Sequence, residues 1–266
     1  MVKLRVLSLF AGIGGFDLGL ERTGGFETVA FCEIDPFCRR VLAKHWPGVP
    51  CYDDVRTLTA ERLAADGIAV DAICGGFPCQ DISLAGRGAG IDGGRSGLWG
   101  EYARLVREIR PQFVIVENVS ALLGRGLGRV LSDLAESGYD AEWECLGAYH
   151  VGAPHIRDRL WIIAYPGSKQ HKGPRAAIEW PGAEGLSCSD SRFRRYWMAS
   201  GKVSAGRHGP IYGDGWPAEP ALDRVAYGVP GRVDRLKALG NAVVPQIPEL
   251  IGRAILASLA EQGAAA

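Results

Sequence analysis

The chain has 266 residues, of which 30 are Lys or Arg and 30 are Asp or Glu, so its formal net charge at neutral pH is zero. A polyanionic partner would therefore have to be held by local basic patches, not by a general positive field. The length suffices for one large hydrophobic core with a modest appendage, and we expect one domain of catalytic size.

The cysteines and the apolar runs indicate in which cellular compartment the protein acts. Seven cysteines form an odd set without a Cys-x-x-Cys pair, which argues against a zinc cage and a disulfide framework and favours a reducing cytosol. The first apolar stretch opens directly into a glycine loop at Gly12, which leaves no room for a signal sequence, and no uncharged run approaches the ~20 residues of a membrane span. We expect a cytoplasmic protein with no membrane partner and no metal site.

Short apolar runs alternate with amphipathic segments as far as about residue 165. The runs expected to be strands are 4–9, 28–33, 69–74, 113–117 and 160–164. Asp35-Pro36 is typical of a helix start, and the segment to Trp46 has apolar residues on one side. Near-continuous apolar strands separated by helices predict a mostly parallel, doubly wound α/β sheet covered on both faces.

The composition changes after Tyr165. The segment that follows is rich in Gly and Pro and has an excess of Lys and Arg, densest at Arg192-Phe193-Arg194-Arg195. It has no convincing strand or helix period, and we expect a small irregular domain over 166–232. Beyond it, apolar residues from Ile247 to Leu259 recur at helical spacing and predict a final helix with one face docked on the core. The expected division is 1–165 plus 233–266 for the first domain and 166–232 for the second.

The first strand runs into a glycine loop that is typical of nucleotide binding. Gly12, Gly14 and Gly15 allow the backbone to pass close to a ligand, and Glu33 stands 19 residues after Gly14, where an acid can accept hydrogen bonds from ribose hydroxyls. The dinucleotide fingerprint is not met, because Asp17 occupies the position of its third glycine. A nucleoside without phosphates is therefore the better ligand, and S-adenosylmethionine fits that description; a glycine turn used only for packing is the alternative.

The end of another predicted strand is followed by a cysteine that can act as a nucleophile. The strand that ends near Cys74 is followed by Pro78, which fixes the chain just before Cys79, at the sheet edge where open α/β folds bind ligands. A working thiolate needs nearby positive charge. Arg157 and Arg159 alternate along a segment expected to be extended, so they should project to the same side.

Each of these residues also has a structural interpretation. Cys74, inside a strand, is expected to be an inert packing residue. Glu117, which ends another apolar run, can bring a carboxyl to the same rim or cap a helix that begins near Ser120. The arginines can be solvated surface. The loop from Ser83 to Gly97 carries many glycines with Arg87 and Arg95, which suits either a lid with phosphate contacts or a passive surface loop.

Together these segments resemble the DNA (cytosine-5)-methyltransferases of bacterial or phage restriction-modification type. The matching segments run in order along nearly the whole chain: 10–16, Glu33, Asp54-Val55, Pro78-Cys79-Gln80, Glu117-Asn118-Val119, Arg157-Asp158-Arg159 and 239–245. Each tripeptide alone is weak evidence, but the ordered set is specific. The fold implied is the Rossmann-like sheet of S-adenosylmethionine-dependent methyltransferases with a small target-recognition domain.

The resemblance implies a covalent mechanism on a base flipped out of double-stranded DNA. Cys79 would add to carbon 6 of cytosine, Glu117 would hold or protonate ring nitrogen 3, Arg159 would bond the exocyclic oxygen, and Arg157 would support the thiolate and a phosphate. The cofactor would be surrounded by Phe10, Gly12, Ile13, Gly14, Gly15, Glu33, Ile34, Asp54, Val55, Pro78, Leu98, Asn241 and Val243. Contacts to DNA would come from Ser83, Arg87, Arg95, Arg192, Arg194 and Arg195.

The resemblance also implies a monomer, acting in a bacterial cell or a phage-infected host, with a cognate restriction endonuclease as a possible partner. Two features depart from the family pattern: His155 stands where glutamine is usual, and the recognition region is short.

Four other functions would share part of this pattern. An RNA cytosine-5 methyltransferase of the same family would use the same thiol chemistry, and a DNA-binding regulator without activity would keep the fold. An adenine methyltransferase would carry an Asn/Asp-Pro-Pro-aromatic turn where Phe77-Pro78-Cys79-Gln80 stands. A thiol redox protein would need a resolving cysteine at a recognisable spacing.

Overall fold

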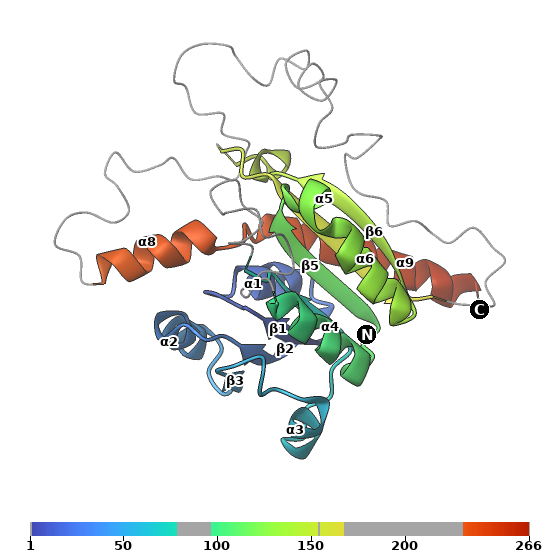
Figure 1. Cartoon of the computed structure of the whole chain (residues 1–266), viewed down its shortest axis with the longest axis horizontal. Helices are drawn as coiled ribbons and strands as arrows, with labels where there is room; N and C mark the ends of the chain where they lie inside the picture. Colours follow the sequence, from blue (N-terminus) through green and yellow to red (C-terminus); the bar gives the residue numbers. More distant parts are fainter. Residues whose placement is uncertain (1, 79–96, 154, 168–230, 266) are drawn as a thin grey trace, which may run out of the picture.

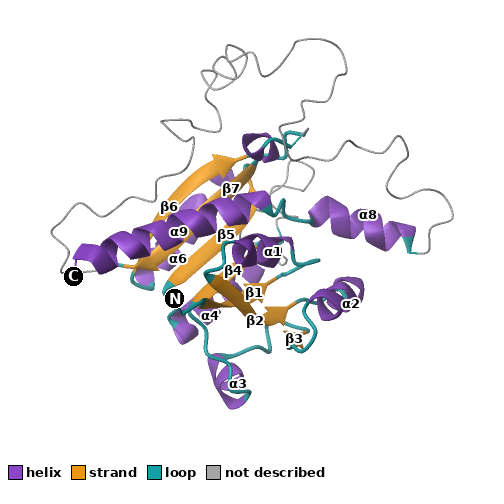
Figure 2. Ribbon diagram, turned by 180° about the vertical axis from the view of Figure 1, so that it is seen from behind, coloured by secondary structure: helices purple, strands orange, loops and turns teal. Residues whose placement is uncertain are grey.

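A computed structural model of the chain describes residues 2–78, 97–153, 155–167 and 231–265. It contains a seven-stranded sheet with helices on both faces (Figures 1 and 2). The strands are β1 (Leu4–Leu9), β2 (Phe26–Cys32), β3 (Cys51–Tyr52), β4 (Ala72–Gly75), β5 (Phe113–Val119), β6 (Tyr139–Leu146) and β7 (Arg159–Pro166). The helices are α1 (Gly15–Arg22), α2 (Pro36–His45), α3 (Ala60–Ala65), α4 (Leu98–Ile109), α5 (Leu122–Arg125), α6 (Leu127–Glu136), the 3-10 turn η2 (Ala148–Val151), α8 (Arg232–Asn241) and α9 (Gln246–Ala265).

The strand order is β3-β2-β1-β4-β5-β7-β6. β1 to β5 are parallel to one another, and β7 is antiparallel to both of its neighbours, β5 and β6. The prediction of a mostly parallel doubly wound sheet is confirmed. Because the chain winds outward in opposite directions from β1 and β4, the crevice between the carboxyl ends of these two strands is the topological switch point, where such sheets bind ligands.

Both faces of the central strands are buried, which explains why they read as continuous apolar runs. Val6 of β1 packs beneath α1 and α9, whereas Leu7 and Leu9 face the opposite layer, which contains Trp99 and Tyr102 of α4. Figures 1 and 2 show the two layers from opposite sides, with α4 and α6 over one face and α1 and α9 over the other.

Helices α2 and α9 bear out their sequence signals. The side chain of Asp35 accepts a hydrogen bond from the Phe37 backbone at 2.9 Å, and Pro36 occupies the first helical position. In α9, Ile247, Ile251 and Ile255 are buried, at helical spacing.

The stretch Val233–Ala260 is long and apolar enough to cross a membrane, with a mean hydropathy of 1.3 over its most apolar part. Within it, residues 242–245 separate α8 from α9, and α9 lies along the sheet and α1. The core helix of a soluble protein can have the same length and composition, so these two properties alone do not indicate a membrane segment.

A buried carboxyl links β1, β2 and α1 beneath the glycine loop. Asp17 is fully buried and accepts hydrogen bonds from the hydroxyls of Ser8 at 3.0 Å and Thr28 at 3.1 Å. Burial raises the pKa of Asp17 to about 7, because the two hydroxyls only partly replace the lost water.

Asp17→Asn is expected to flatten the dependence of stability on pH. Because the folded pKa of Asp17 lies above its unfolded value, the native state keeps a proton that the unfolded chain loses. The contribution of Asp17 to the free energy of unfolding should therefore fall as pH rises from about 4 to about 7, by an amount on the order of 4 kcal/mol. Urea unfolding of both proteins at pH 5 and pH 8 measures this, and equal pH slopes for wild type and variant would contradict the assignment.

Candidate active site at the switch point

Three chain segments meet at the carboxyl edge of the sheet. The loop after β1 begins at Phe10, the turn after β4 begins at Gly76, and Glu117 lies near the end of β5. Since β1, β4 and β5 are neighbours and parallel, their carboxyl ends place these segments side by side at the switch point.

The loop after β1 has a backbone that depends on glycine. Gly12 and Gly14 have φ values of 57° and 81°, and Phe10 also has a positive φ, of 54°, which is uncommon for a residue with a β-carbon. The Glu33 carboxylate, near the end of β2, accepts hydrogen bonds from Gly12 N and Asp35 N, both at 2.7 Å. Glu33 thus joins the glycine loop to the start of α2.

The far side of the loop is closed by the segment between α8 and α9. A β-carbon added at Gly15 would lie 2.5 Å from the carbonyl oxygen of Val243, and one added at Gly19 would collide with the carbonyl oxygen of Pro245. The sequence places Gly15 and Val243 more than 200 residues apart, and the fold brings their backbones into contact.

Gly15→Ala is therefore expected to displace the 243–245 segment, since a backbone carbonyl cannot give way as a flexible side chain can. If S-adenosylmethionine is the ligand, as the sequence predicts, its affinity should fall by roughly tenfold or more. Isothermal titration calorimetry measures the change. Gly100→Ala is the matched control, because no atom lies within 4 Å of a β-carbon built at that helical glycine. Equal affinities of the two variants would contradict the contact.

The other residues expected around the cofactor differ in their surroundings. Val55 is buried in the core, whereas Ile34 is 67% exposed. Asp54 pairs with Arg56, with oxygen and nitrogen 2.6 Å apart, and this guanidinium holds the pKa of Asp54 below its usual range. A ligand that uses Asp54 would have to compete with Arg56. Leu98 begins α4 and Asn241 ends α8.

Glu117 lies directly behind the turn that leads to the predicted nucleophile. Its side chain is only 13% exposed, and its Oε1 lies 2.9 Å from Nε of Arg159. A β-carbon at Gly76 would be 2.5 Å from the other carboxylate oxygen, and Asn118 Nδ2 donates to the carbonyl of Phe77 at 3.1 Å. These contacts hold the end of β5 against the residues that lead to Pro78.

Burial raises the pKa of Glu117, and the nearby charges of Arg159 and Arg157 only partly offset it. A carboxyl of this kind can exchange a proton with a bound group at near-neutral pH more readily than an exposed one.

The expectation that 155–159 is extended throughout is wrong at Arg157. This residue has a φ of 36°, and its Nη1 donates to the carbonyl of Gly240 at 2.8 Å, while Arg159 begins β7 and pairs with Glu117. The left-handed backbone conformation of Arg157 turns the chain between η2 and β7, which simple alternation does not describe. Burial also lowers the pKa of Arg157.

A cavity of about 1000 Å³ lies between the glycine loop, the arginine segment and the segment between α8 and α9, and neither Glu117 nor the turn at Gly76 lines it. Its walls come from Ile13–Gly15 of the glycine loop, from His155, Arg157 and Arg159, and from Leu239 and Ala242–Gln246. The predicted cofactor loop and both predicted arginines therefore line one space, together with His155, the residue that departs from the family pattern.

Several predicted site residues lie outside the described residues. These are Cys79, Ser83, Arg87, Arg95, Arg192, Arg194 and Arg195. Pro78, the last described residue before Cys79, is half-buried and follows the turn at Gly76 that faces Glu117.

Trp46 and Glu21 belong to the wall of this cavity, and the sequence did not indicate it. Both line the cavity beside Gly14, and Trp46 Nε1 donates to Glu21 at 2.9 Å. The sequence shows only that a tryptophan follows the predicted helix that starts at Pro36. It does not indicate that the indole ring points toward the glycine loop.

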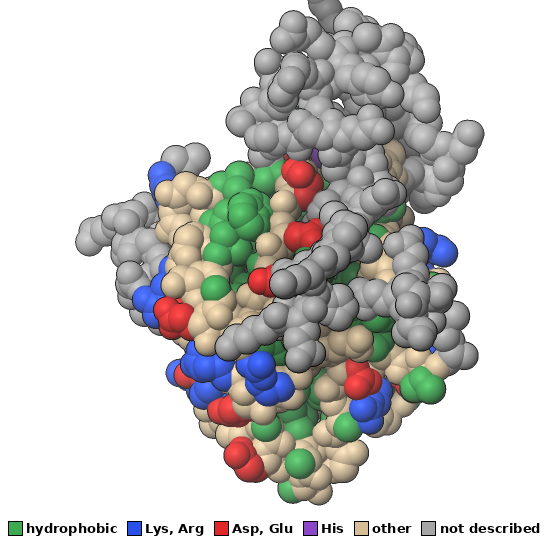
Figure 3. Space-filling model, turned by 90° about the vertical axis from the view of Figure 1, so that its right-hand side faces the viewer, with side chains coloured by type: hydrophobic (Ala, Val, Ile, Leu, Met, Phe, Trp, Pro, Cys, Tyr) green, Lys and Arg blue, Asp and Glu red, His purple; other side chains and the backbone are tan. Residues whose placement is uncertain are grey.

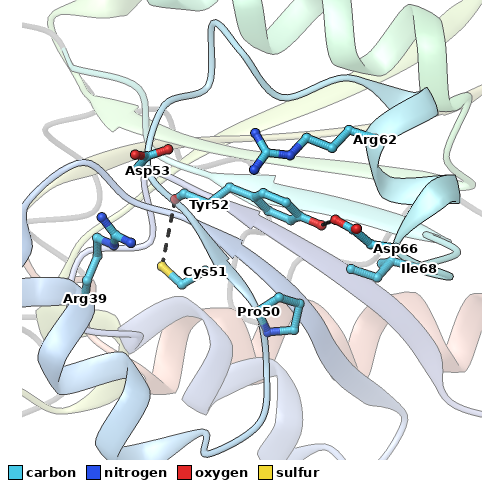
Figure 4. Close-up of a pocket in the computed structure, with 8 residues that line it drawn as sticks. All are labelled: Arg39, Pro50, Cys51, Tyr52, Asp53, Arg62, Asp66 and Ile68. Carbon is cyan, nitrogen blue, oxygen red and sulfur yellow. Dashed lines mark hydrogen bonds between the residues drawn. The ribbon is translucent and has the colours of Figure 1, made fainter.

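A smaller cavity of about 470 Å³ lies at edge strand β3 (Figure 4). Tyr52 crosses it and donates its hydroxyl to Asp66 at 2.5 Å, and Arg62 lies 4.8 Å above the Tyr52 ring. Because the aromatic ring and its hydroxyl are already paired within the chain, these contacts fasten α3 to the edge of the sheet.

The described surface offers no broad field of one sign on the face drawn in Figure 3. There Lys and Arg side chains lie among Asp and Glu side chains. This mixture agrees with the zero net charge of the sequence.

Known proteins resemble this chain in sequence and in fold. The profile of the family described as C-5 cytosine-specific DNA methylase matches residues 4–186. Type II methyltransferase M2.BsuMI of Bacillus subtilis is 38% identical over 60% of this chain and 42% of its own length. Type II methyltransferase M.Bsp6I of a Bacillus species is 35% identical over 76% of this chain and 66% of its own length.

A crystal structure described as a candidate DNA modification methyltransferase of an E. coli prophage is similar with a TM-score of 0.53 and 30% identity. The match covers 62% of this chain and 47% of that one. The chain thus spans about two fifths to two thirds of the length of these relatives.

Proposed function

The chain belongs to the C-5 cytosine-specific DNA methylase family, and from that premise we propose that it transfers a methyl group from S-adenosylmethionine to carbon 5 of a cytosine in double-stranded DNA. The observation that carries the proposal is the Glu117–Arg159 pair, held behind Gly76 at the turn that leads to Cys79. This arrangement would offer one carboxyl and one cation to a planar ring, and Cys79 follows the same turn in the sequence.

The glycine loop and its surroundings suit the cofactor. The φ values of Gly12 and Gly14, the open space beside Gly12 and the Glu33 carboxylate near the end of β2 together form a cradle for a nucleoside. Phe10, Gly12–Gly15, Glu33, Ile34, Asp54, Val55, Pro78, Leu98, Asn241 and Val243 are proposed to hold it. When bound, it supplies a methyl group on a sulfonium.

The chemistry explains why a thiol and a carboxyl are needed. Carbon 5 of cytosine is too poor a nucleophile to accept a methyl group unaided. The Cys79 thiolate adds to carbon 6, Glu117 holds a proton at ring nitrogen 3, and Arg159 bonds the exocyclic oxygen, so that carbon 5 gains electron density. After methylation, carbon 5 loses its proton to a base or water and the bond between sulfur and carbon 6 breaks, which restores the ring and the thiolate.

The base must leave the duplex for this reaction, at a cost of about a few kcal/mol. Residues 166–232 are proposed to recognise the target, with the loop 83–97 closing over the base. Ser83, Arg87, Arg95, Arg192, Arg194 and Arg195 are the proposed contacts to DNA. The protein is proposed to act as a monomer in the cytoplasm of a bacterium or a phage-infected host, with a cognate restriction endonuclease as its partner.

Incubation with labelled S-adenosylmethionine and matched DNA duplexes or tRNA tests the substrate. Label in carbon 5 of cytosine in duplex DNA is the expected result. Label in tRNA alone would instead identify an RNA methyltransferase. Tight cofactor binding without transfer to either would identify a regulator without activity.

A further inference from the structure

The ring of Trp46 fills the space that the missing β-carbon leaves at Gly14. A β-carbon built on Gly14 would lie 2.5 Å from both Cη2 and Cζ3 of Trp46. Gly14 is the N-cap residue of α1, with a φ of 81°, and Gly14 and Trp46 line the same cavity. The indole therefore limits the directions in which the glycine loop can move.

The ring is itself held from two other sides. Its Nε1 donates to Glu21 Oε2 at 2.9 Å, while Oε1 of the same carboxylate accepts a hydrogen bond from the backbone of Thr28 at 3.1 Å. Phe31 of β2 meets the indole edge to face, with ring centroids 5.4 Å apart. The position of Trp46 is thus fixed by α1 and β2 as well as by its own helix.

Helix α2 consequently contacts the glycine loop through both of its ends. At its start, Glu33 accepts hydrogen bonds from Asp35 N and from Gly12 N. At its end, Trp46 abuts Gly14. The two glycines with positive φ in the loop are each restrained by one end of the same helix.

We propose that Trp46 is a positioning residue for S-adenosylmethionine, which acts by holding the glycine loop through Gly14 before the ligand binds. The inference rests on the proposed function. Pre-ordering a glycine-rich loop reduces the conformational entropy lost on binding, so the contribution of Trp46 belongs to affinity and not to the chemical step.

Trp46→Ala is expected to raise the Kd and the KM for S-adenosylmethionine by about tenfold, with kcat at saturating cofactor within about twofold of wild type. Trp46→Phe keeps a ring against Phe31 and Gly14 but loses the bond to Glu21, so we expect a rise of roughly threefold. Trp143→Ala, on β6 and 45% exposed, is the control and should match wild type.

Titration calorimetry measures Kd, and steady-state kinetics separate an effect on KM from an effect on kcat. Raised Kd and KM with unchanged kcat, partly restored by Phe, support the inference; should the Ala variant fail to fold, the Phe variant decides. A Kd within twofold of wild type in the folded variants, or a fall in kcat alone, overturns it and leaves the proposed function intact. Absence of cofactor binding by the wild type would reject both.

Discussion

Glu117→Gln is expected to lower kcat for DNA methylation by ~10²–10⁴-fold while cofactor affinity stays within about twofold. The amide keeps the shape of the side chain and an acceptor for Arg159 Nε, which lies 2.9 Å from the carboxylate. It cannot exchange a proton with ring nitrogen 3. Burial raises the pKa of Glu117, which favours the protonated form that this step requires.

The control for this variant is Glu144→Gln. Glu144 is a half-buried carboxyl whose pKa is likewise raised by burial, but it lies on β6, where it accepts a hydrogen bond from the backbone of Cys145. Single-turnover rates with saturating cofactor and duplex should separate the two. Similar rates for both variants would remove Glu117 from the chemical step.

Cys79→Ala is expected to reduce methyl transfer by about 10⁴-fold or more, because no other group then activates carbon 5. Cofactor binding should persist, since Glu33 and the 243–245 segment hold the glycine loop through the contacts described above. Cys74→Ala is the comparison, because Cys74 is fully buried in β4, where burial raises the pKa of its thiol well above its ordinary value. An active Cys79→Ala protein alongside an inactive Cys74→Ala protein would reverse the assignment.

Much of the fold was predictable because β1, β4 and β5 are buried on both faces, and such strands need continuous apolar runs. The sequence did not predict the two edge strands of the sheet, β3 and β6. β3 has only two residues, and in β6 polar residues such as Glu142 and Glu144 alternate with apolar ones. An edge strand can expose one side to water, so its sequence carries a weaker signal.

Within the site, residues at strand ends were predictable and contacts between distant segments were not. Glu33 and Glu117 follow apolar runs, which places them at the carboxyl edge of the sheet. Nothing in the sequence indicates that Val243 abuts Gly15, that Trp46 abuts Gly14, or that the chain turns at Arg157. These features depend on backbone geometry and packing between elements far apart in the chain.

A duplex that carries 5-fluorocytosine tests the covalent step most directly, since fluorine at carbon 5 prevents the final loss of a proton and traps the enzyme. With S-adenosylmethionine present, denaturing electrophoresis and mass spectrometry should show a covalent complex of the wild-type protein with this DNA, attached at Cys79. The complex should be absent from Cys79→Ala. A covalent complex that persists in Cys79→Ala, or attachment at another residue, would contradict the account.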